Sequence, residues 1–146
     1  MNPDDYVSYP IALALKKAGF DEPCDHYYCT FDNETDVRFW SIHPAQSQNG
    51  LRTPQDTVVA DAPTLAQAQK WLRDRCGIHI NVCIYSDYST DADGKVCDRW
   101  DFWGFDLYAV SGGKQIEDGD GEYDSYESAL SAGIAAALEL IEKEGE

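Results

Sequence analysis

The sequence predicts a single α+β domain in which three helices pack with a mostly antiparallel sheet of about four to five strands. Three observations lead to this prediction. The chain of 146 residues has the size of one domain, with 43% hydrophobic residues to supply a core. Three segments repeat apolar residues at helical spacing, and the segments between them alternate or are rich in β-branched and aromatic residues. The predicted order is helix, two or three strands, helix, two strands, helix.

The first predicted helix follows Ser8, which we expect to be its N-cap. Apolar residues between Ile11 and Ala18 recur on one face, which is typical of an amphipathic helix. Gly19 is expected to end the helix in the left-handed conformation, and Phe20 can then pack back on its last turn.

Two strands are predicted at residues 26–31 and 37–42, where aromatic and β-branched residues gather on either side of a turn-like segment at 32–34. The polar segment 44–56 is expected to be a loop that can lead into a further strand at 57–59. A second helix then begins with Thr64 and Gln67 in capping-box spacing and ends at Gly77.

The run 78–85 alternates, which places Ile78, Ile80, Val82 and Ile84 together on a core-facing side. After a polar loop at 87–99, the segment 100–110 is apolar on both faces, as in a central strand that is covered on two sides. Asp124 and Glu127 have capping-box spacing at the start of the third helix.

The charge and the termini bear on partners and location. With 27 acidic against 11 basic residues, the net charge of −16 repels nucleic-acid phosphates and anionic membranes, so we expect no direct DNA or RNA binding. This acidity serves solubility or attracts a basic partner surface. No apolar run reaches the roughly 20 residues that span a bilayer, and the start of the chain lacks a basic, then apolar leader. We therefore expect no membrane association and a cytoplasmic protein with its five cysteines reduced.

The sequence offers weak candidates for a metal site. Zinc-ligand residue types occur at Cys24, His26, Cys29, His79 and Cys83, but without a C-x-x-C pair. Along a strand at about 3.3 Å per residue, His79 and Cys83 lie about 13 Å apart, too far to share one ion. In the acidic segment 89–100, Trp100 stands where a calcium-binding loop needs glutamate, and in the segment 118–123, Tyr123 stands where such a loop needs glycine. We expect neither a metal nor a cofactor.

Catalysis is also weakly supported, because no nucleophile-elbow, zincin or phosphate-loop motif is present. A small hydrolase built on Cys83 with His79, or on Asp101 with Asp106, is an alternative that the fold would have to assemble. We assign no catalytic residue.

Aromatic and basic residues around the second helix and the last strands are the candidate ligand-binding group. An aromatic ring beside an arginine can stack on a base and hold a phosphate. The competing interpretation, which the residue types favour, is a core of tryptophans with solvated arginines. The seven candidates are Trp71, Arg73, Arg75, Tyr85, Arg99, Trp100 and Trp103.

Parts of the chain resemble a family of small uncharacterised acidic proteins common in phages and mobile elements of gut anaerobes. The resemblance rests on APTLAQAQKWLR at 62–73 with GIHI at 77–80, on KAGFDEPC at 17–24 and on YDSYESAL at 123–130. It implies a phage setting rather than an activity, a cofactor or site residues.

Three functional hypotheses follow. The first is a non-catalytic counter-defence protein that sequesters a nucleotide-type host immune signal at a homo-oligomer interface, in the host cytoplasm if the chain is phage-encoded. The second is an acidic, DNA-mimic-like inhibitor of a basic host protein that binds nucleic acid. The third is the small hydrolase, which would require turnover.

Overall fold

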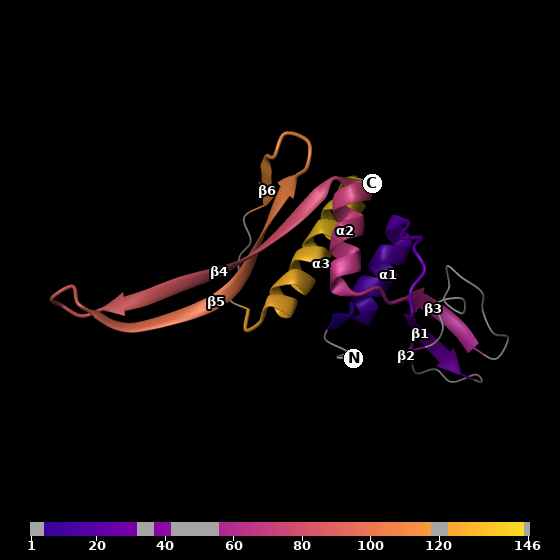
Figure 1. Ribbon diagram of the computed structural model, residues 1–146, viewed down its shortest axis with the longest axis horizontal. Coiled ribbons are helices and arrows are strands. Elements are labelled where there is room, and N and C mark those ends of the chain that lie inside the picture. The colour runs from indigo at the N-terminus through magenta and orange to yellow at the C-terminus, as the bar shows by residue number, and fades with distance from the viewer. Residues whose placement is uncertain (1–4, 32–36, 42–55, 118–122, 145–146) are drawn as a thin grey trace.

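Three helices lie between two antiparallel sheets in the computed structural model of the protein (Figure 1), which confirms the α+β class. The structure describes residues 5–31, 37–41, 56–117 and 123–144. Its elements are α1 (Tyr9–Ala18), β1 (His26–Phe31), β2 (Arg38–Ser41), β3 (Asp56–Asp61), α2 (Leu65–Cys76), β4 (Ile78–Thr90), β5 (Val96–Ala109), β6 (Gln115–Glu117) and α3 (Tyr126–Glu144).

The described strands form two separate sheets rather than one. The first has the order β2-β1-β3 and the second has the order β4-β5-β6, and all pairs are antiparallel. The predicted turn at 32–34, the end of the second strand at Ile42 and most of the predicted loop (residues 44–55) lie outside the described residues.

The helix boundaries follow the predicted capping residues, with one correction. Gly19 ends α1 at a φ of 99°, and Gly77 ends α2 at a φ of 71°. The backbone N–H of Phe20 donates to the carbonyl of Leu15 at 2.9 Å, and both side chains are buried. This is the glycine-terminated helix end that the sequence predicts.

The correction concerns the start of α3. Asp124 was the predicted cap, but the hydroxyl of Ser125 accepts the backbone N–H of Ser128 at 3.1 Å. Serine and aspartate are both favoured at N-caps, and each has a polar residue three positions later, so composition alone does not choose between them.

The core is one continuous cluster to which all three helices contribute. Leu72, Ile80, Leu107 and Ile134 are completely buried within it. The helix α3 packs on β4 and β5 so closely that a methyl group added at Gly133 would lie 2.6 Å from a methyl carbon of Ile80. The absence of a side chain at this position permits the contact.

Beyond this core, β4 and β5 continue as a two-stranded arm (residues 84–102) that projects away from the helices (Figure 1). The predicted loop at 87–99 is therefore mostly strand, and its tip is a turn at 91–95. Ile84 was expected to face the core, but it is 60% exposed, and Trp100 is 42% exposed rather than covered. Strand periodicity predicts which face a residue occupies but not how far the helices extend to cover that face.

Candidate ligand-binding groove

The seven residues predicted from sequence fall into two groups, of which the first lies on α2. Trp71 is buried and packs edge-on against Phe20, with ring centroids 5.5 Å apart. Its indole N–H has no hydrogen-bond partner among the described residues. Arg73 forms an ion pair with Asp74 at 3.6 Å, and Arg75 forms one with Asp21 at 3.3 Å. Trp71 therefore belongs to the core, while both arginines point into ion pairs at the surface.

The second group lies on β4 and β5. The hydroxyl of Tyr85 donates to Asp106 at 3.1 Å, and its ring stacks on Phe102. Burial, the hydrogen bond to Asp106 and the charge of that carboxylate raise the pKa of Tyr85 to about 12. The remaining three members are Trp103, which packs edge-on against Tyr126, and Arg99 and Trp100, which are exposed on the arm.

A groove of about 860 Å³ lies between α1 and α3, and none of the seven residues lines it. Its size is in the range of small-molecule sites, about 300–1,000 Å³. The residues that line it are Tyr6, Val7, Ser8, Pro10, Ile11, Tyr28, Leu65, Tyr123, Ser125, Glu127, Ser128, Ser131, Ala132 and Ala135.

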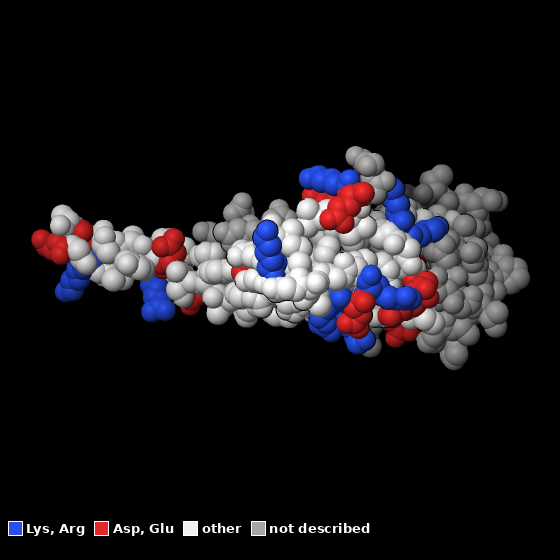
Figure 2. Space-filling view, turned by 90° about the horizontal axis from the view of Figure 1, so that it is seen from above, with Lys and Arg blue, Asp and Glu red and all other residues white. Residues whose placement is uncertain are grey.

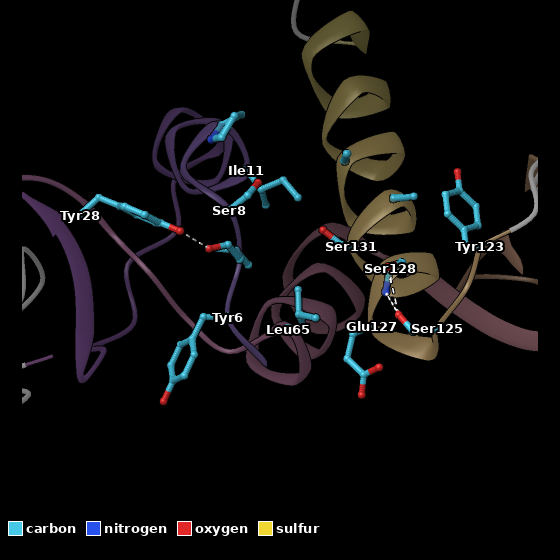
Figure 3. Close-up of a pocket in the computed structure, with 14 residues that line it drawn as sticks. Tyr6, Ser8, Ile11, Tyr28, Leu65, Tyr123, Ser125, Glu127, Ser128 and Ser131 are labelled. Carbon is cyan, nitrogen blue, oxygen red and sulfur yellow. Dashed lines mark hydrogen bonds between the residues drawn. The ribbon is translucent and has the colours of Figure 1, made fainter. Parts of the chain in front are cut away.

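The groove has an apolar floor and a hydroxyl-bearing wall (Figure 3). Val7, Ile11 and Leu65 line it with buried apolar side chains. Ser131 lies on the side of α3 that faces Leu65 and α1. On the other side, the hydroxyl of Tyr28 donates to the carbonyl of Val7 at 2.7 Å, which fixes the strand β1 against the start of α1. The groove thus offers both apolar contact and hydrogen-bonding groups.

The electrostatics of the groove disfavour a strongly anionic ligand. The lining includes the acidic residue Glu127, and none of the described lining residues is a lysine or an arginine. The N-terminus of α3 carries a partial positive charge, but the serine cap at Ser125 already accepts the amide of Ser128. A ligand would be recognised by its rings and hydroxyl groups rather than by its phosphates.

One wall of this groove has a recognisable pattern in the sequence. Ser128, Ser131, Ala132 and Ala135 recur at helical spacing on α3, and these short side chains leave room between the two helices. The opposite wall comes from residues 6–11, more than 100 positions away in the chain. Sequence periodicity could identify the small-residue face but not its partner.

The structure brings no proposed catalytic pair together. The amide of Asn81 donates to the sulfur of Cys83 at 2.9 Å, and His79 lies four residues from Cys83 along the same strand. Asp101 is exposed and bonded to Ser86, whereas Asp106 is buried and accepts from Tyr85. Because these carboxylates are five residues apart on one strand, they point to opposite faces.

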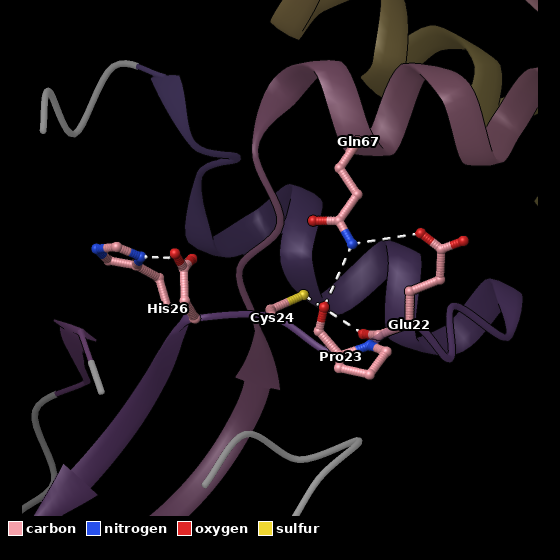
Figure 4. A network of polar contacts seen from close by, with 6 residues as sticks. Glu22, Pro23, Cys24, His26 and Gln67 are labelled. Atoms are coloured by element: carbon pink, nitrogen blue, oxygen red, sulfur yellow. Dashed lines mark hydrogen bonds and ion pairs between the residues drawn. The ribbon is translucent and has the colours of Figure 1, made fainter. Parts of the chain in front are cut away.

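Cys24 is held in a structural network rather than beside a base (Figure 4). Its thiol donates to the carbonyl of Glu22 at 3.4 Å, and burial is the main cause that raises its pKa. Gln67 donates to the carboxylate of Glu22 at 3.3 Å, which ties this loop to α2. The ring of His26 turns away from the thiol and bonds to Asp25 at 2.9 Å. A protonated, buried thiol is a poor nucleophile.

Among the described residues, no group of three or more histidine, cysteine, aspartate or glutamate side chains could hold a metal ion. Asp91, in the acidic turn at the tip of the arm, instead accepts the backbone N–H groups of Asp93 and Lys95. No helix in the described part of the chain is long and apolar enough to cross a membrane.

Acidic and basic side chains are mixed on the surface that Figure 2 shows. Lys and Arg lie beside Asp and Glu over the helices and on the arm. The described part of this face therefore carries no continuous acidic patch that would match a DNA backbone.

Comparisons of the chain with protein-family models, with curated proteins and with solved structures find no match.

Proposed function

We propose that the protein is a non-catalytic binding protein that holds the nucleoside part of a nucleotide-type signal in the groove between α1 and α3. The observation that carries the proposal is the combination, in one cavity of about 860 Å³, of an apolar floor with hydroxyl groups on its walls. A nucleoside presents the matching chemistry, a flat ring system with hydroxyl groups on the sugar.

This proposal moves the site away from the seven residues predicted from sequence. The groove lining supports recognition of base and sugar, and its described residues include no arginine for the phosphates. The resemblance to proteins of phages and mobile elements supports a host immune signal as the physiological ligand, so the protein would act in counter-defence by sequestration.

A thermal-shift screen tests the proposal, with nucleosides, their mono- and triphosphates, and cyclic dinucleotides as ligands. A ligand at about 100 times its Kd stabilises the folded state by about 2.7 kcal/mol, which raises the melting temperature by several degrees. We expect a rise with at least one nucleoside and a rise no larger than this with its phosphorylated forms.

A matched pair of variants locates the site. Ala135→Tyr places a large ring in the groove, whereas Ala66→Tyr makes the same change at an exposed position of α2 outside the groove. The first variant should lose the ligand-induced shift, and the second should keep it. Loss in both variants, or in neither, would contradict binding in the groove. No shift across the whole panel would instead favour the acidic inhibitor, which should bind a basic protein with steep salt dependence.

A further inference from the structure

Among the described residues, no strand pairs with the outer edge of β5 within the arm. At the base of the arm, Trp103 donates its backbone N–H to Tyr123 at 2.9 Å and accepts the N–H of Tyr123 at 3.0 Å. Since backbone groups alternate sides along a strand, the N–H and C=O groups of Arg99 and Asp101 point to this same edge. In the described residues no strand pairs with β5 there, because β6 pairs only near Leu107 and Tyr108. Such an edge is a template for another strand.

The side chains at this edge are self-complementary in one antiparallel register. Arg99, Trp100 and Asp101 are consecutive in the sequence. A twofold axis at Trp100 therefore places Arg99 of each copy opposite Asp101 of the other copy, which makes two equivalent pairs. Both hydrogen-bonded pairs then use the groups that point outward. Centring the axis on Arg99, Asp101 or Asp98 would place two like charges opposite each other, which is unfavourable. An axis at Phe102 would require Trp103, whose backbone groups already bond to Tyr123.

The surroundings of the edge fit this register. Arg99 and Asp101 lie 4.0 Å apart within one chain, with side chains 70% and 58% exposed, and each also bonds to the hydroxyl of Ser86. These exposed contacts are weak, so both side chains can exchange them for a partner across the edge. In this register Trp103, whose backbone groups bond to Tyr123, lies opposite Cys97 of the second copy, where pairing between the copies would end. A bulge between the pairs Ser89–Asp98 and Thr90–Val96 lets the tip bend away at that point.

We propose that two copies of the protein pair through the outer edges of their β5 strands, with the twofold axis at Trp100. Charge complementarity selects a second copy as the occupant of this edge. The pairing would cover Trp100, which is 42% exposed, against its counterpart. Because the arm projects from the helices (Figure 1), the two bodies, each of net charge −16, would stay apart.

Charge reversal tests the register. Sedimentation equilibrium should give a mass that rises with concentration from 16.3 kDa towards twice that value. Arg99→Asp alone and Asp101→Arg alone should each weaken dimerisation at least tenfold. The double variant Arg99→Asp with Asp101→Arg restores opposite charges in this register and should recover the dimer. A single species of 16.3 kDa at all concentrations, or a double variant as weak as the single ones, would overturn the proposal.

Disulfide cross-linking gives a second readout that does not depend on the affinity. In a Cys97→Ser background, Trp100→Cys would place two cysteines opposite each other in a non-hydrogen-bonded pair, with Cα atoms about 4.5 Å apart, which a disulfide can bridge. Asp87→Cys, at the paired position on β4, is the matched control. Rapid oxidation of the first variant alone is expected. Equal cross-linking of both would place the contact elsewhere, and circular dichroism checks that both variants fold.

Discussion

Cys24 and Tyr85 are both neutral when protonated, and the fold favours that form in each. Burial raises the pKa of Cys24, and burial with the bond to Asp106 raises that of Tyr85 to about 12, from an ordinary value of 10.0. A raised pKa in the folded state stabilises the protein fully below the unfolded-state pKa, and this stabilisation is lost as the pH rises through the folded-state pKa. Both residues therefore make the fold weaker in alkali.

The pH dependence at Tyr85 can be isolated by substitution. Between about pH 10 and pH 12 the wild type should lose the part of its stability that comes from keeping this phenol protonated. Tyr85→Phe has no group that ionises there, so its urea midpoint should fall less over the same interval. Parallel pH profiles for the two proteins would show that Tyr85 does not titrate as described.

A substitution at Gly133 tests whether helix propensity or close packing determines stability at this position. In an exposed helix, replacing glycine with alanine stabilises by about 1 kcal/mol. Here the new methyl group would lie 2.6 Å from the Ile80 side chain and 3.2 Å from Phe105, and such overpacking typically costs about 1–3 kcal/mol. Gly133→Ala should therefore lower the melting temperature, and a higher melting temperature would refute the close contact of α3 with β4.

Substitutions of Trp71 and Arg73 test whether these residues stabilise the fold or bind a ligand, as the sequence predicted. Trp71→Ala removes a buried ring and should destabilise the protein by about 3–5 kcal/mol. Arg73→Ala, at a partly exposed surface ion pair, should change stability by less than about 0.5 kcal/mol and leave ligand binding unchanged. If Arg73→Ala folds but no longer binds the ligand, the result would support the site predicted from sequence rather than the groove.

At the scale of elements, helix caps give a paired test. Thr64 accepts the backbone N–H of Gln67 at 3.0 Å, whereas Ser8 makes no side-chain capping bond to α1. Thr64→Ala should cost about 1 kcal/mol of stability, and Ser8→Ala should cost clearly less. Chemical denaturation measures both. Equal losses would mean that the two residues stabilise their helices in another way.

The same elements show what the sequence could predict. Glycines at 19 and 77 and the cap at Thr64 define helix ends through local geometry, so these boundaries were predictable. Local patterns did not reveal that the strands separate into two sheets or that the β4–β5 hairpin extends beyond the helices that cover its base. Both features depend on contacts between distant segments. The groove was missed for the same reason, since residues 6–11 and α3 form opposite walls.

At the scale of the whole molecule, the groove and the arm are separate surfaces. The groove lies between α1 and α3, whereas the proposed dimer contact lies on the arm, which projects beyond the helices. Variants of Arg99 and Asp101 should therefore change the mass in solution without changing ligand-induced stabilisation. The same variants examined in both assays would reveal any coupling between the two surfaces.

The most direct test of the proposed function is a calorimetric titration of a nucleoside identified in the thermal screen, and of its triphosphate, at low and high salt. The described groove lining includes Glu127 but no arginine or lysine, so we predict that the triphosphate binds no more tightly than the nucleoside and that added salt does not weaken its binding. A triphosphate that binds at least tenfold more tightly than the nucleoside, with affinity that falls steeply in salt, would contradict recognition through base and sugar in this groove.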